Sequence, residues 1–140
     1  MHKPNSMSLF KSFLLFCIAF LLVVTTTPIG FVYALVRQIL FSKVKSLSIF
    51  FVEVAIALDA AGNVMMQHLL NDTLLVKNKD TYFFGNKKET ISSVIGKNSL
   101  TNTLSFMGNQ LNAFLNFIDK GHSLDSIIYD VKAIKDNKAS

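Results

Sequence analysis

The stretch from Ser12 to Val36, SFLLFCIAFLLVVTTTPIGFVYALV, contains no charged residue. A helix over these residues would be about 37 Å long, whereas a bilayer core of ~30 Å needs about 20 apolar residues. Only a helix can cross lipid alone, because its backbone groups satisfy one another. We therefore predict a transmembrane helix over 12–36. Its membrane-spanning side chains include Phe13, Leu14, Leu15, Phe16, Ile18, Phe20, Leu21 and Leu22.

Polar and helix-breaking residues interrupt the second half of this stretch. Pro28 follows three threonines and precedes Gly30, so we expect the helix to bend or end there, with threonine hydroxyls bonding back to earlier carbonyls. A secretory signal peptide is the alternative, with basic residues first and a cleavage site after Ala34. That site lies about ten residues beyond the apolar core, which favours an uncleaved anchor.

The composition of the whole chain agrees with contact to lipid. Of its 140 residues, 51% are hydrophobic and 16% are charged, and the mean hydropathy is +0.41; soluble domains carry about 25% charged residues. The first 46 residues hold five basic residues and no acidic one, whereas the remainder holds nine of each. We therefore predict membrane-interface positions for Lys11, Arg37, Lys43 and Lys45. We expect no nucleic-acid partner, since no basic stripe follows.

A second apolar stretch, Val44 to Leu70, is typical of one long helix. Glu53 and Asp59 interrupt it. The free energy needed to insert these two acidic residues into a membrane nearly cancels the free energy gained by inserting the apolar residues. We therefore expect an amphipathic helix facing the membrane, although a second span stays open if the acids are paired or protonated. On spacing alone, the stripe of Asp59, Asn63 and Gln67 is interpreted as the solvent-facing side.

The C-terminal part predicts a small helical cap. Turn signals occupy 71–98, and a short helix from Glu89 is expected to end at Gly96 in a left-handed C-cap. A longer helix is expected over Asn98–Lys120, with apolar residues on one face at Leu104, Met107, Leu111, Phe114, Leu115 and Ile118. Ser123 is expected to cap a last helix that runs to about Ile134.

These predictions define an all-α fold with an N-terminal transmembrane helix, a long membrane-facing amphipathic helix and a small helical C-terminal cap. The expected divisions are a polar tail (1–11), the transmembrane helix (12–36), a basic linker with the second apolar helix (37–70), and the helical surface domain (71–140). Three blocks in the last two divisions stand out: Ala57-Leu58-Asp59 with Gly62-Asn63, Glu89-Thr90-Ile91-Ser92-Ser93 with Gly96-Lys97, and Asp119-Lys120-Gly121-His122-Ser123 with Ser126-Ile127.

The three blocks resemble a family of small uncharacterised proteins from bacterial genomes, often from phages and prophages. The resemblance covers about Ala57 to Ile127. The family pattern has a cysteine where this chain has Ser123, and an acidic stretch where it has Phe84-Gly-Asn-Lys-Lys88. This departure speaks against a thiol or metal role. The resemblance instead implies a structural polar network of Asp59, Asn63, Glu89, Thr90, Ser92 and His122.

The sequence predicts no catalytic, cofactor-binding or metal site. Cys17 is single and lies within the apolar run, and the histidines show no zinc-ligand spacing. Phosphate-loop and nucleophile-elbow patterns are missing. An enzyme that uses Asp59, Glu89 and His122 is the alternative, and it would require these three residues to cluster.

We therefore expect a non-enzymatic, membrane-anchored scaffold encoded by a phage or prophage. It would join a bilayer to a protein layer or to further copies of itself, in a bacterial inner membrane or a virion membrane. We predict a single-pass anchor, and the basic flanks favour an orientation with the C-terminal part cytoplasmic or interior. A holin-like lysis or pore protein with two spans is one alternative. A domain secreted after cleavage at Ala34 is the other.

Overall fold

The computed structural model describes residues 8–41 and 44–127, and within these residues the fold is all-helical, as predicted. The helices are α1 (Leu9–Phe41), α2 (Val44–Met65), α3 (Gln67–Thr73), α4 (Ile91–Leu100) and α5 (Phe106–Ile118), and residues 122–127 are also helical. The chain forms two compact units, Met1–Phe51 and Val52–Ser140. Lys43 and the expected helical residues 128–134 lie outside the described residues.

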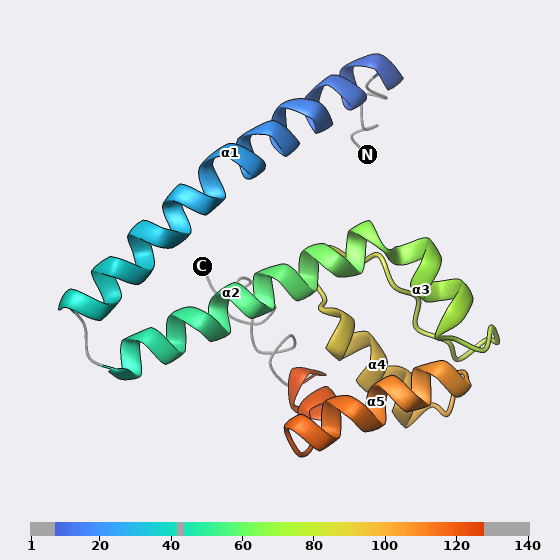
Figure 1. The fold of residues 1–140 in the computed structure, drawn as a ribbon. Coiled ribbons are helices and arrows are strands. Elements are labelled where there is room, and N and C mark those ends of the chain that lie inside the picture. Colours follow the sequence, from blue (N-terminus) through green and yellow to red (C-terminus); the bar gives the residue numbers. More distant parts are fainter. Residues whose placement is uncertain (1–7, 42–43, 128–140) are drawn as a thin grey trace, which may run out of the picture. The chain divides into compact units, whose positions relative to one another are not determined.

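The long helix α1 contains the predicted apolar stretch and continues through Pro28 without a break (Figure 1). Pro28 has no N–H to donate to the preceding turn. Threonine hydroxyls nearby bond back to the backbone: Thr25 Oγ1 donates to the carbonyl of Leu21 at 2.8 Å, and Thr26 Oγ1 to that of Leu22 at 2.7 Å. None of the α1 side chains is buried.

Within the unit Met1–Phe51, the end of α1 and the start of α2 form a helical hairpin. The rings of Phe31 and Phe50 lie 5.9 Å apart between centroids. Ser46 Oγ donates to Gln38 Oε1 at 2.9 Å. The first two turns of α2 therefore run back along the last turns of α1.

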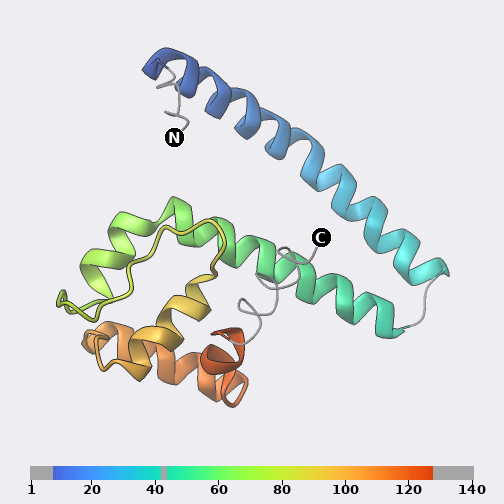
Figure 2. The same cartoon turned by 180° about the vertical axis from the view of Figure 1, so that it is seen from behind.

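The other unit, Val52–Ser140, is a small helical domain. The chain turns from α3 into a loop that returns to α2, where α4 begins, and α4 and α5 pack together (Figure 2). Its core consists of seven buried apolar residues, with Ile91, Leu111 and Leu115 packed against them. The seven are Leu70, Leu74, Leu75, Phe84, Val94, Ile95 and Leu104. So small a core makes hydrogen bonds important to the fold.

The helix expected over Asn98–Lys120 is interrupted, and that prediction is wrong. Asn102 adopts a left-handed backbone conformation with φ of 53°. The segment after it pairs with the chain that follows α3: Val76 N–H donates to Thr103 O and Ser105 N–H donates to Leu74 O, both at 2.8 Å. Ser105 then caps α5 by accepting from Gly108 N–H at 3.1 Å.

Two capping predictions near this point are also wrong. Gly96 lies inside α4, where a side chain would overlap the backbone carbonyl of Ser123. It therefore serves close packing between helices and does not end one. Ser123 lies inside the helical residues 122–127, and its hydroxyl donates to Asn112 Oδ1 at 2.7 Å. The continuous helix expected to reach Leu70 also breaks, at Met66 between α2 and α3.

Candidate functional site

Asp59, on the second half of α2, holds the first turn of α4. Its carboxylate oxygens accept from Ile91 N–H at 3.0 Å, from Ser92 N–H at 3.3 Å and from the Ser92 hydroxyl at 2.7 Å. A carboxylate is favoured there because the first N–H groups of a helix have no partner within it and carry partial positive charge. The prediction that this stripe faces solvent is therefore wrong at Asp59.

Asn63 lies one turn further along α2 and is fully buried. Its amide nitrogen donates to the carbonyls of Asn86 at 2.9 Å and Glu89 at 2.7 Å, and its amide oxygen accepts from Gly85 N–H at 3.0 Å. The side chain of Asn63 thus makes three hydrogen bonds to the backbone of the loop before α4. Asn63 fixes this loop against α2, so it also does not face solvent.

The other residues of the predicted network lie around the start of α4. Glu89 forms an ion pair with Lys97 at 2.9 Å, and both side chains are largely shielded from solvent. Glu89 also accepts from Asn86 Nδ2 at 3.1 Å. Thr90 is the N-cap of α4, and its side chain accepts from Ser93 N–H at 3.1 Å. The structure therefore brings the predicted residues of α2 and α4 together around one helix start.

Two further asparagines hold the same loop, and the sequence reasoning did not single them out. Asn71 pairs with the backbone of Phe84, accepting at 2.8 Å and donating at 3.2 Å. Asn98, fully buried on α4, likewise accepts from Tyr82 N–H at 3.0 Å and donates to Tyr82 O at 2.7 Å. The neighbours of these asparagines include Lys97, Ser99 and Asp72, so the sequence contains no local signal that their amides are held by a distant loop.

His122 lies apart from the hydrogen bonds of this network. Its Nδ1 lies 3.2 Å from Asp119 Oδ2. It does line a groove of about 310 Å³ together with Asp59 and Thr90. The remaining walls come from α2 and from the helical residues 122–127, and they are formed by Val52, Ala55, Ile56, Asp125 and Ser126. Glu89 is not among the lining residues, so the three residues of the enzyme alternative do not meet in this groove.

The groove offers little free chemistry. Both oxygens of Asp59 already accept hydrogen bonds from the start of α4. No group of three or more potential metal ligands occurs within residues 8–41 and 44–127. Away from the groove, a hydrogen bond from Lys77, at 2.6 Å, lowers the pKa of the exposed carboxyl of Asp72.

The predicted membrane-spanning residues all lie on α1, and all are exposed. Lys11 stands near its start and Arg37 near its end. In the part of the chain that the structure describes, two helices are long and apolar enough to cross a membrane: Leu9–Phe41, and Ser46–Met65 within α2. A signal sequence or the core helix of a soluble protein can have the same length and composition.

No protein family, curated protein or solved structure matches this chain. The resemblance to prophage-encoded proteins therefore stays a prediction. The structure thus contains an exposed apolar helix, α1, and a small domain. Within that domain, the side chains of Asp59, Asn63, Asn71 and Asn98 bind the backbone of α4 and of the loop before it.

Proposed function

We propose that this protein is a membrane-anchored structural protein without enzymatic activity, and that α1 is its single span. The observation that carries the proposal is α1 itself: 33 residues in one helix, with none buried and no charge between Lys11 and Arg37. Such a surface has no favourable setting in water, because large exposed apolar patches mark lipid or protein contacts. Twenty residues after Lys11, about 30 Å along the helix, the chain reaches Phe31.

The hairpin of α1 and α2 then falls at the far membrane interface. Phe31 is the residue that packs against Phe50. The expected interface residues Arg37, Lys43 and Lys45 fall within nine residues of sequence, between the apolar parts of α1 and α2, where anionic headgroups would attract them. The second half of α2 belongs to the small domain, since Asp59 and Asn63 bond to the residues that start α4.

These hydrogen bonds between α2 and the start of α4 disfavour a second membrane span over α2. A span over Ser46–Met65 would place Asp59, Asn63 and the backbone they bind within the hydrocarbon core. Only the residues from Ser46 to Leu58 remain free of those bonds, and they reach about 20 Å, well short of the ~30 Å needed. Past Phe50, α2 would therefore tilt along the bilayer surface and not continue into the core. The domain would then lie on that surface as a scaffold for a protein layer or for further copies of the chain. The sequence resemblance favours a phage or prophage origin.

A second candidate, a two-span pore or lysis protein, is favoured by the helical hairpin and by the apolar content of α2. Its basic turn would lie on one side of the bilayer, and the domain on the other. The two candidates thus differ in whether the turn and the domain share a side.

Cysteine accessibility in sealed membrane vesicles distinguishes them. In a Cys17→Ser background, single cysteines replace Lys43 in the turn and Lys79 in the domain, and Phe20→Cys serves as the buried control. A membrane-impermeant maleimide is added before and after detergent. We expect positions 43 and 79 to react from the same side, and position 20 only after detergent. Reaction of 43 and 79 from opposite sides would establish the two-span candidate and overturn ours.

A further inference from the structure

We propose that α5 lies flat in the bilayer interface and forms a second, reversible membrane contact. This inference rests on the proposed function and deepens it. The contact is made by the outer face of α5, which we define as Phe106, Met107, Phe114, Phe117 and Ile118. At 100° per residue these residues lie within an arc of about 120°, and the exposed amide of Gln110 lies within the same arc.

The outer face is apolar and strongly exposed. Phe106 is 79% exposed, Phe117 is 88% and Ile118 is 67%. The whole helix, FMGNQLNAFLNFI, carries no charged residue. Interfacial helices bury an apolar face of this kind about 5–10 Å into the headgroup boundary, and the polar residues of α5 are uncharged amides. At 13 residues, or about 20 Å, α5 is too short to cross the bilayer.

The helix cannot turn this face inward, because its other side is fixed by hydrogen bonds. Asn112 accepts from Ser123 Oγ at 2.7 Å and donates to Ser99 Oγ at 3.1 Å. Asn116 donates to Asn112 at 3.3 Å. Gly108 packs so closely on the Leu74 carbonyl that a side chain would overlap it. The exposure of the outer face is thus set by the fold of the domain.

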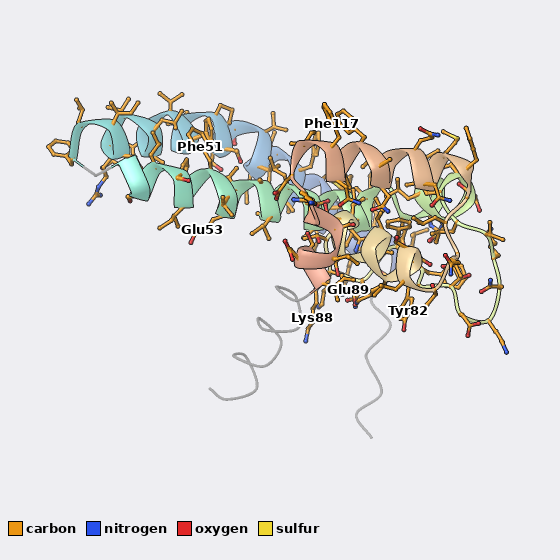
Figure 3. The ribbon with its side chains drawn as sticks, turned by 90° about the horizontal axis from the view of Figure 1, so that it is seen from below. Phe51, Glu53, Tyr82, Lys88, Glu89 and Phe117 are labelled. Carbon is orange, nitrogen blue, oxygen red and sulfur yellow. The ribbon has the colours of Figure 1, made fainter. Side chains whose placement is uncertain are left out.

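Two charged residues of the same domain, Lys88 and Glu89, lie away from the outer face. Figure 3 shows Phe117 projecting from one side of the unit Val52–Ser140, whereas Lys88 and Glu89 lie toward the opposite side. Residues 42–43 alone separate α1 from α2, and α2 is about 33 Å long. A spanning α1 would therefore keep the domain within reach of the bilayer surface.

A lipid surface fits the outer face better than a second copy does. A stable protein interface needs about 20–30 residues on each side, whereas this face offers five. A bilayer sets no such requirement, because affinity grows with each apolar side chain immersed.

The test is fluorescence quenching in the full chain, reconstituted in lipid vesicles. In the Cys17→Ser background, an environment-sensitive probe is attached to a single cysteine at Phe117, at Asn78 in the exposed loop, or at Phe20 in α1. Lipids with a quencher on the acyl chain report immersion, and aqueous iodide reports exposure to water. Phe117 is a suitable position because its exposed side chain contributes little to packing.

We expect lipid quencher to lower the emission at position 117 by about twofold, as for a shallowly buried group, while position 78 responds to iodide alone. Quenching of 117 by iodide as strong as that of 78 would overturn the inference. Protection of 117 from both quenchers would also overturn it, by showing a protein contact such as a second copy. The result at position 20 separates the two proposals: lipid quenching at 20 without quenching at 117 leaves the anchor intact, whereas its absence at 20 removes the proposed function.

Discussion

Replacement of Asp59 by alanine should release the start of α4. The carboxylate accepts from Ile91 N–H, Ser92 N–H and the Ser92 hydroxyl. Hydrogen bonds to charged groups contribute about 1.5–3 kcal/mol each, and removal of a helix N-cap costs about 1 kcal/mol. Water from the adjoining groove can solvate the freed donors, which reduces the loss. We therefore expect Asp59→Ala to lower the free energy of unfolding of the domain by about 3 kcal/mol.

Hydrogen–deuterium exchange of the full chain in lipid nanodiscs measures this loss. A change of about 3 kcal/mol corresponds to about 100-fold faster exchange of the α4 amides, since each ~1.4 kcal/mol is a factor of ten. Asp59→Asn keeps one acceptor oxygen and removes the charge, so we expect about 1 kcal/mol and about fivefold. The graded pair distinguishes lost hydrogen bonds from a general disturbance of α2.

Asp80→Asn is the matched control, because its carboxylate is exposed and surface substitutions change stability by less than about 0.5 kcal/mol. Unchanged exchange in α4 for Asp59→Ala, equal to that of the control, would refute the reasoning. The carboxylate would then be incidental to the start of the helix.

Three further changes test other parts of the domain. Gly96→Val should overlap the Ser123 carbonyl and cost about 2–3 kcal/mol, seen as a lower thermal midpoint in circular dichroism. Asn98→Ala should leave buried groups of the loop without partners and cost about 2 kcal/mol, measured by denaturant titration. Lys77→Ala should raise the pKa of Asp72 toward its ordinary value, which NMR titration measures. The pKa of Asp72 is lowered in the folded protein. Its contribution to stability is therefore present above the ordinary pKa and is lost as the pH falls through the pKa of the folded state.

The long helices could be predicted because a single property determines them. Twenty-five residues without charge leave a helix as the only structure that satisfies the backbone in lipid, and α1 covers that stretch. The break between α4 and α5 was missed because apolar spacing continues across it. Its cause is pairing of Thr103 and Ser105 with Leu74 and Val76, and contacts far apart in sequence leave no local signal.

The polar network also depends on distant contacts that the local sequence does not indicate. From helix spacing alone, Asp59 and Asn63 fall on the polar side of α2, which is ordinarily the side that faces water. Both instead bind backbone groups more than twenty residues away. Gly96 was interpreted as a helix end because glycine is common there, but the carbonyl of Ser123 occupies the space of its side chain. In each case the partner comes from a distant segment.

Alkaline carbonate extraction of cell membranes tests the central claim, that α1 stays in lipid, most directly. We expect the full chain to remain in the membrane pellet. Ile18→Arg with Leu22→Arg, which places two charges at a cost of about 2.5–3.5 kcal/mol each near the middle of the span, should move it to the supernatant. Recovery of the unaltered chain in the supernatant, as for a domain released after Ala34, would contradict the account.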